Sequence, residues 1–205
     1  MTARCRDEVS HVSDMLPAFL NLSGRTVVLV GGGTVAQAKL QQLLAVGACV
    51  RVVAPAIAPA IRAAGVEIAE RAFVPQDLDG AWFVVAAATP DVNRAVAEAA
   101  ETRHLFVNAV DDPANASAFL SGVVRRDGVT IAVSTRGDAP ALTALVREAL
   151  DAVLPRDLGA WMDLARAERA DWRRRRVAIE LRKPRLLRAL NDLYKPPPER
   201  RDEVM

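Results

Sequence analysis

Small residues between Gly31 and Ala36 have the types and the spacing that bind a dinucleotide. The run Gly31-x-Gly33-x-x-Ala36 fits the dinucleotide-binding fingerprint, with alanine at the third glycine position. The first glycine allows a sharp exit from a strand, the second lets the backbone approach a pyrophosphate, and the third small residue lets helix and strand pack closely. The other interpretation is a chance run of glycines in a turn. A strand pattern before the run and a helix pattern after it argue against that interpretation.

Two adjacent carboxylates, Asp111 and Asp112, are the best candidates for proton transfer. A carboxylate beside another carboxylate in a cleft holds a proton more tightly and can act as an acid or a base. Aspartate also caps turns, and Pro113 follows this pair directly. From the spacing alone, both interpretations stay open.

Four further polar residues can bind a ligand or satisfy the backbone. Asn108 can orient a ligand or close a strand end. Ser117, Ser134 and Thr135 can bind substrate carboxylates, although hydroxyl groups near turns commonly cap the backbone instead. We take all four as candidate substrate-binding residues.

Composition argues against several other chemistries. The two histidines, His11 and His104, do not complete a Ser/His/Asp arrangement. The two cysteines give neither a disulfide framework nor metal-ligand spacing, so no resident metal is expected. Of these cysteines, Cys49 is predicted to be a small core residue.

Charge and hydropathy limit the partners and the compartment. The formal net charge of +2 points to no particular partner, and we expect neither a nucleic acid nor a membrane. No apolar run reaches the roughly 20 residues of a membrane span. Because residues 1–14 also lack an apolar signal core, we expect a cytoplasmic protein.

Apolar runs that alternate with helical periodicity predict the scaffold of the site. Each run is apolar throughout, which is typical of a parallel sheet with helices on both faces. One helix is expected from the glycine run to about Val46, and another from Thr89-Pro90-Asp91, where Asp91 suits the N-cap. The strands are expected at residues 26–30, 49–53, 66–69, 82–88 and 105–110.

Ligands of such sheets bind beyond the carboxyl ends of the strands. The segments expected there, residues 31–35, 54–56, Thr89 and 108–112, therefore converge on one crevice. A ribose-binding carboxylate is expected about 20 residues past the glycines. Residues 52–55 contain none, so the choice between NAD and NADP stays open at this point. The residues expected to bind the cofactor are Gly31, Gly32, Gly33, Thr34, Val35, Pro55, Ala56 and Thr89.

The pattern changes after Pro113. Strand-like runs at 118–124 and 129–134, joined by a turn with Asp127-Gly128, predict a hairpin, and a helix is expected from Pro140 to about Val153. Since a lone hairpin is marginal in water, we expect it to pack on a second subunit. The predicted organisation is a mobile tail (1–14), a Rossmann-type nucleotide-binding domain (15–113), a dimerisation segment (114–154), a helical domain (155–195) and a disordered tail (196–205).

The predicted helical domain is rich in arginine between Arg166 and Arg188, and Pro184 is expected to break or restart its helix. Three interpretations of the charge remain open. It can form a solvated amphipathic face, a nucleic-acid surface, or one wall of a cleft for a polyanionic small molecule, where arginine pairs with carboxylates.

Four segments together resemble a known enzyme family. In order and spacing they are similar to precorrin-2 dehydrogenase, the bifunctional dehydrogenase/ferrochelatase module of sirohaem synthase. The resemblance covers about residues 16–158. The segments are LVGGGTVAQAKLQQLLAVGACVRVVAP, VVAAATPD, FVNAVDDPANASAFLSGVV and IAVSTRGDAPALTALVREALDAVLP.

The resemblance implies a homodimer that oxidises the tetrapyrrole precorrin-2 to sirohydrochlorin with NAD⁺, and it leaves open whether the protein also inserts Fe²⁺ to give sirohaem. It implies that Asp111 is the general base. It implies NAD contacts at Thr34 and Val35 and at Pro55 and Ala56, which agrees with the missing ribose carboxylate. It further implies that the C-terminal helical domain closes the substrate cleft.

One departure from the family pattern is Thr135, where some relatives carry a second serine beside Ser134. Three alternatives are kept. The first is a non-catalytic module that senses NAD, and the second is another NAD(P)-dependent reductase with a small substrate. The third is a nucleic-acid binder that uses residues 166–188.

Overall fold

The computed structural model describes residues 15–120 and 122–195. The two predicted tails, 1–14 and 196–205, lie outside the described residues. The chain divides into two compact units between Ala118 and Phe119. Within the described ranges, no helix combines the length and the apolar character that crossing a membrane requires.

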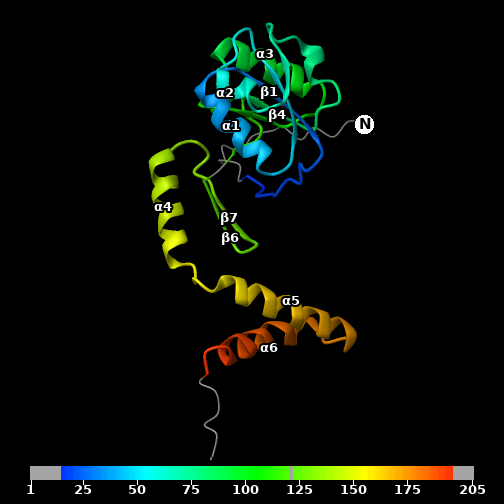
Figure 1. Cartoon of the computed structure of the whole chain (residues 1–205), viewed down its shortest axis with the longest axis vertical. Helices are drawn as coiled ribbons and strands as arrows, with labels where there is room; N and C mark the ends of the chain where they lie inside the picture. The colour runs from blue at the N-terminus through cyan, green and yellow to red at the C-terminus, as the bar shows by residue number, and fades with distance from the viewer. Residues whose placement is uncertain (1–14, 121, 196–205) are drawn as a thin grey trace, which may run out of the picture. The chain divides into compact units, whose positions relative to one another are not determined.

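A five-stranded parallel sheet forms the centre of the first unit (Figure 1). Its strand order is β3-β2-β1-β4-β5, so the order reverses between β1 and β4. In such a sheet the ligand edge lies at the carboxyl ends of the strands, beside this reversal. The predicted Rossmann-type fold is therefore confirmed. The strands are β1 (Thr26–Val30), β2 (Cys49–Val53), β3 (Glu67–Ala69), β4 (Phe83–Ala86) and β5 (Val107–Ala109).

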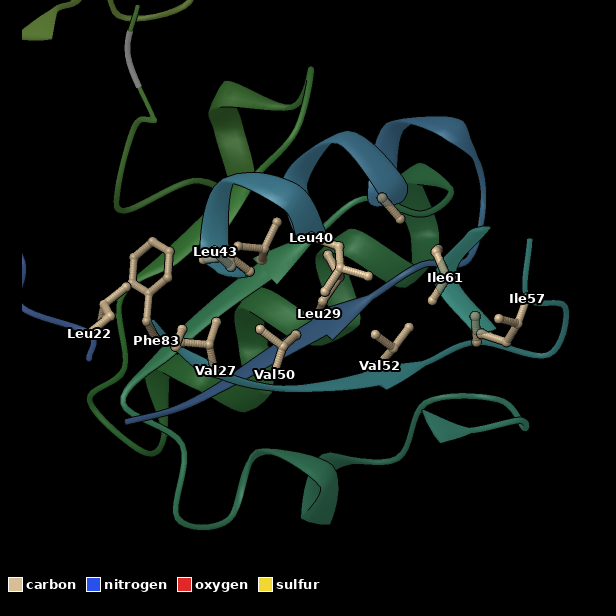
Figure 2. Close-up of a cluster of buried hydrophobic side chains, with 14 residues drawn as sticks. Leu22, Val27, Leu29, Leu40, Leu43, Val50, Val52, Ile57, Ile61 and Phe83 are labelled. Atoms are coloured by element: carbon tan, nitrogen blue, oxygen red, sulfur yellow. The ribbon is translucent and has the colours of Figure 1, made fainter. Parts of the chain in front are cut away.

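Alternate residues of each strand face two hydrophobic clusters, one on each side of the sheet. On one side Val27 and Leu29 meet Leu40 of α1 (Thr34–Leu44), and Figure 2 shows this side chain pointing from the helix toward the sheet. On the other side Val28 meets Val96 of α3 (Pro90–Glu101). The α1-side cluster contains Leu22, Val27, Leu29, Ala36, Leu40, Leu43, Ala48, Val50, Val52, Ala54, Ile57, Ile61, Phe83 and Val85, and the α3-side cluster contains Val28, Val30, Val53, Leu78, Val84, Ala86, Val96, Ala99, Ala100, Val107 and Ala109.

Short helical segments connect the strands of this unit. The α2 helix (Pro59–Arg62) follows β2, and its Ile61 is fully buried. Two 3₁₀ turns, η1 (Pro75–Leu78) and η2 (Pro113–Asn115), precede β4 and follow β5. In η1 the Asp77 carboxylate accepts two hydrogen bonds from the Arg71 guanidinium and one from the Val74 N–H, and these bonds fix the turn.

The second unit begins with an antiparallel hairpin of β6 (Gly122–Arg126) and β7 (Val129–Val133). Its turn residues Asp127 and Gly128 both have positive φ, +48° and +86°, as a two-residue type I′ turn requires. The Arg126 guanidinium donates to the Asp151 carboxylate and the Leu154 carbonyl, which attaches the hairpin to α4 (Pro140–Val153). The predicted hairpin and helix are both present.

Two further helices, α5 (Leu158–Arg174) and α6 (Ile179–Asp192), complete the described chain. The indole N–H of Trp161 in α5 donates to the Tyr194 hydroxyl at 2.6 Å, and that hydroxyl donates to the Asp157 carboxylate. These bonds tie the start of α5 to the end of α6. The predicted C-terminal helical region is therefore confirmed.

Three local predictions were wrong. Thr89, rather than Asp91, is the N-cap of α3, because Pro90 occupies the first helical position. Cys49 is exposed rather than buried, because it is the first residue of β2 and lies at the strand end. Pro184 lies inside α6 without ending it. The hydrogen bond that Pro184 cannot donate would have gone to the carbonyl of Glu180, an exposed residue that water can reach.

Candidate functional site

The glycine turn after β1 passes between the ends of two neighbouring strands. The Gly31 N–H donates to the Val53 carbonyl at 2.9 Å, and Gly31 has a φ of +133°. A Cβ at Gly31 would lie 2.2 Å from the Ala87 carbonyl oxygen, and one at Gly32 would lie 1.9 Å from the Ala56 carbonyl oxygen. The backbone therefore requires glycine at both positions before any ligand is considered.

Gly33 differs from its two neighbours because a Cβ there would meet no atom of the described residues within 4 Å. It is the N-cap of α1, has extended backbone angles, and carries no side-chain cap. The first turn of α1, all of which the structure describes, has no acidic residue, and Thr34 and Val35 are exposed. Uncapped N–H groups at the positive end of a helix dipole fit a pyrophosphate, so this turn is suited to a dinucleotide cofactor.

The segment after β2 forms the next wall of the site. Pro55 and Ala56 are exposed, and the Ala58 N–H donates to the Gly32 carbonyl at 2.9 Å, which holds this segment against the glycine turn. Residues 54–56 have no carboxylate for a ribose. Recognition of a ribose by backbone groups of this segment stays a prediction.

The loop after β4 is held by a side chain that the sequence prediction missed. Asn93 of α3 is buried, and its Oδ1 accepts a hydrogen bond from the Ala88 N–H at 3.1 Å. Thr89 stands exposed at the start of α3 beside this bond. The sequence signal that could have indicated this contact is the position of Asn93, a polar residue four positions after the helix N-cap Thr89.

The segment after β5 holds the two candidate carboxylates in different settings. The Asp112 carboxylate accepts a hydrogen bond from the Asn115 side chain at 2.9 Å, so it stabilises the η2 turn. The Asp111 side chain is exposed and makes no hydrogen bond or ion pair of 4.0 Å or less with the described residues. Asp111 also has a φ of +56°, a conformation that L residues other than Asn and Asp rarely adopt. Of the pair, Asp111 is the carboxylate that is free to act on a ligand.

Asn108 precedes this segment, and only one of the two polar groups of its side-chain amide has a hydrogen-bond partner among the described residues. Its amide N–H donates to the Ala118 carbonyl at 3.0 Å, whereas its buried Oδ1 has no hydrogen-bond partner among the described residues. The hydroxyl of Ser117 accepts from the Val107 N–H at 2.9 Å, at the amino end of β5 rather than the carboxyl end. Asn108 thus lies three residues before Asp111, and Ser117 stabilises the strand end opposite the ligand edge.

Ser134 and Thr135 belong to the second unit, where both hydroxyls make local contacts. The Ser134 hydroxyl accepts from the Arg136 N–H at 3.1 Å. The Thr135 hydroxyl accepts from the Ala139 N–H at 3.3 Å and pairs with the Thr143 hydroxyl at 2.8 Å, next to the start of α4. These contacts order the turn between β7 and α4, and a role in substrate binding stays a prediction.

Lys39 is a second residue that the sequence prediction missed. It is the only charged residue of α1 and is half-buried. Burial lowers the pKa of the Lys39 ammonium, and the negative charge of Asp111 partly offsets that by raising it. The Asp111 carboxylate therefore lies within electrostatic range of Lys39. A single charge in an otherwise neutral helix was visible in the sequence, but its partner was not.

Comparison with known proteins agrees with this geometry. A family model described as "Putative NAD(P)-binding" matches residues 18–122, which contain the glycine turn and the carboxyl ends of the five parallel strands. The chain belongs to this NAD(P)-binding family. Its NAD(P)-binding region therefore corresponds to the first unit together with the start of β6.

Several named proteins are similar to this chain. The chain is 41% identical over 152 residues to siroheme synthase 3 of Aeromonas hydrophila, covering 72% of this chain and 32% of that protein. It is 39% identical over 167 residues to the siroheme synthase of Photorhabdus laumondii, covering 79% and 35%. Thus the chain spans about a third of the length of these curated relatives.

A solved structure extends the similarity beyond the NAD(P)-binding region. The structure of SirC, a precorrin-2 dehydrogenase, superposes with a TM-score of 0.67 and 26% sequence identity. The match covers 88% of this chain and 92% of that chain, so the likeness includes both units.

Proposed function

We propose that this protein is an NAD-dependent dehydrogenase that oxidises precorrin-2 to sirohydrochlorin. The observation that carries the proposal is the likeness to a precorrin-2 dehydrogenase along nearly the whole of both chains. The siroheme synthase relatives support the same pathway chemistry.

The roles of the residues follow from the ligand edge of the sheet. The pyrophosphate of NAD would be held by the α1 dipole and by backbone N–H groups of Gly32, Gly33, Thr34 and Val35. Gly31, whose N–H is bonded to the Val53 carbonyl, would contribute by shaping the turn. Pro55, Ala56 and Thr89 would contact the rest of the cofactor from the neighbouring loops. When bound, NAD⁺ supplies the acceptor for a hydride.

Asp111 would act as the general base. Oxidation removes a hydride and a proton from the substrate, and the proton needs an acceptor near the reacting ring carbon. The carboxylate of Asp111, exposed and without a hydrogen-bond partner among the described residues, is suited to that task, whereas the Asp112 carboxylate is bonded to Asn115. Asn108, Ser134 and Thr135 remain proposed substrate contacts, whereas Ser117 is bonded to the backbone at the strand end opposite the ligand edge and is not proposed as one.

We also propose a homodimer that forms through residues 114–154. Support comes from α4, which buries none of its residues although it is largely apolar. Its side chains Leu142, Leu145 and Val153 are 50%, 63% and 81% exposed, and a second subunit would cover them. Iron insertion is a further part of the proposal, with Fe²⁺ as a substrate, because the curated relatives are named for sirohaem, an iron tetrapyrrole.

The test is anaerobic turnover of precorrin-2 with NAD⁺, followed by absorbance of sirohydrochlorin and of NADH. We expect the two products to form in equal amounts, and Asp111→Asn to abolish turnover while NAD⁺ still binds. Asp163→Asn, which removes an exposed carboxylate of α5, is the matched control and should retain activity. Binding of NAD⁺ without any sirohydrochlorin would instead support the NAD-sensing alternative. Addition of Fe²⁺ to the completed reaction then tests for sirohaem.

A further inference from the structure

The edge strand β5 is bonded to residues that follow it in the chain. It is the last strand in the sheet order, so only β4 pairs with it in the described sheet. Away from β4, the Val107 N–H donates to the Ser117 hydroxyl at 2.9 Å, and the Val107 carbonyl accepts from the N–H groups of Ser117 and Ala118, both at 2.9 Å. The Asn108 side-chain amide also donates to the Ala118 carbonyl at 3.0 Å. We call residues 107–108 and 117–118, joined in this way, the anchor.

The segment between the two halves of the anchor carries Asp111. Its start is fixed to the sheet, because the Val110 N–H donates to the Ala86 carbonyl at 2.8 Å. Residues 111–116 then make hydrogen bonds only with one another in the part of the chain that the structure describes. One of them, Ala116, packs against the α3-side cluster. The path of this segment therefore depends on Val110 at one end and on the anchor at the other.

The direction of the Asp111 carboxylate is set by the backbone. The side chain makes no hydrogen bond or ion pair with the described residues that could orient it. The backbone of Asp111 lies in the left-handed region, with a φ of +56°, a conformation that persists where the surrounding structure fixes it. A change in the path of residues 111–116 would therefore move the carboxylate directly.

The anchor also lies where the chain leaves the first unit. Ala118 is the last residue of that unit, and Phe119 begins the second. Without the anchor, the segment that carries Asp111 would continue into the connection between the units with no bond to β5 after Val110. The exposed side chain of Ser117 is therefore better explained by its bond to Val107 than by its own contact with a ligand.

We propose that Ser117 is a positioning residue for Asp111, because its hydroxyl closes the anchor that holds the Asp111 carboxylate at the ligand edge. The amide N–H of Asn108 supports the same anchor. The catalytic part of this inference rests on the proposed function, whereas the anchor itself does not. Ser117 acts through the backbone of residues 107–118 and does not itself touch the reacting atoms.

The first experiment measures the anchor without any turnover. Hydrogen exchange of single backbone amides is followed by NMR in the intact wild-type protein and in Ser117→Ala, which removes the acceptor of the Val107 N–H. The amides of residues 117 and 118 should exchange about tenfold faster in this variant, because local opening requires less free energy once the bond is lost. The matched control is Thr102→Val, which removes an exposed hydroxyl that donates to the Ala99 carbonyl at the end of α3. The same two amides should keep their wild-type rates in the control.

The second experiment measures the catalytic consequence. Oxidation of precorrin-2 is expressed per NAD⁺-binding site, so that unfolded protein is not counted. In Ser117→Ala, kcat should fall about tenfold while KM for precorrin-2 and the affinity for NAD⁺ stay within about twofold, because the base is misplaced and the binding groups are kept. Ser117→Thr keeps the hydroxyl at an exposed position and should recover most of the activity. Thr102→Val should behave as wild type.

The outcomes separate the inference from the proposed function. If residues 117 and 118 exchange at the wild-type rate in Ser117→Ala, or equally fast in Thr102→Val, the inference is overturned whatever the enzyme does. If exchange responds as expected but the wild-type protein does not oxidise precorrin-2, the anchor stands and the proposed function fails. With an active wild type, an unchanged kcat in Ser117→Ala would overturn the positioning role. A raised KM for precorrin-2 at unchanged kcat would also overturn it, because Ser117 would then be a substrate contact.

Discussion

Alanine substitutions at Gly32 and Gly33 should separate what the fold needs from what the cofactor needs. Within the part of the chain that the structure describes, a Cβ at Gly33 meets nothing within 4 Å, and the backbone angles of Gly33 suit any residue. The fold should therefore accept Gly33→Ala at a cost of about 1 kcal/mol, the usual loss when alanine replaces a better N-cap. That corresponds to a fall in Tm of about 4 °C for a unit of this size.

The same methyl group would stand where the pyrophosphate must approach the backbone. Each charge-assisted hydrogen bond that is lost weakens binding by about 1.5–3 kcal/mol, so NAD⁺ affinity should fall by about 10- to 100-fold. Gly32→Ala behaves differently because its Cβ would lie 1.9 Å from the Ala56 carbonyl oxygen, far inside ordinary contact. The backbone must move, and we expect a destabilisation of about 3 kcal/mol or more.

Calorimetric titration with NAD⁺ and thermal unfolding by circular dichroism measure the two effects. Gly33→Ala should lose affinity with little loss of Tm, and Gly32→Ala should lose Tm strongly. If folded Gly33→Ala binds NAD⁺ as tightly as wild type, the glycine turn is not the pyrophosphate cradle and the reasoning about the site is wrong.

Two further predictions concern stability. The Arg71 guanidinium holds the pKa of Asp77 below its ordinary value, so the pair stabilises the fold above the ordinary carboxyl pKa and loses that contribution as pH falls through the lowered one. Asp77→Asn should lower Tm by about 5 °C at pH 7. Between neutral and acidic pH, the Tm of the variant should fall less than the Tm of the wild type, as thermal scans would show. Equal pH dependence of Tm in both proteins would contradict this reasoning. The hydrogen bond to Asp157 raises the pKa of Tyr194, so this phenol should ionise at higher pH than a free tyrosine in an absorbance titration. Tyr194→Phe should loosen the α5–α6 contact and change Trp161 fluorescence, and an unchanged emission spectrum would argue against that link.

Much of the fold could be predicted because local sequence signals and long-range packing agree. The bounds of β1 and α4 match the predicted 26–30 and 140–153, since Gly31 ends the first and Pro140 begins the second. Strands β4 and β5 are shorter than their apolar runs, and the side chains of Trp82 and Phe106 just before them are exposed. The backbones of both residues still bond to the neighbouring strand, since the Trp82 N–H donates to the Thr26 carbonyl and the Phe106 carbonyl accepts from the Val84 N–H. Hydropathy alone does not reveal where pairing stops.

The site was predictable only where a backbone motif defines it. The glycine turn depends on residues close in sequence, so its pattern is visible without a structure. The contact of Asn93 with the Ala88 N–H and the proximity of Lys39 to Asp111 depend on how helices lie over the sheet. The hydroxyl of Ser117 illustrates the same limit, since its bond to Val107 follows from the path of the chain after β5.

The left-handed backbone at Asp111 has a consequence for mutational scanning of this protein. Only glycine, asparagine and aspartate adopt that conformation readily, so most replacements would combine a chemical change with a conformational penalty of about 1 kcal/mol or more. A mutant library that measures only total enzyme activity for substitutions at Asp111 would therefore combine the effects on folding yield and on reactivity in one number. Expression level measured in parallel, with asparagine and glycine as reference alleles, would resolve the two.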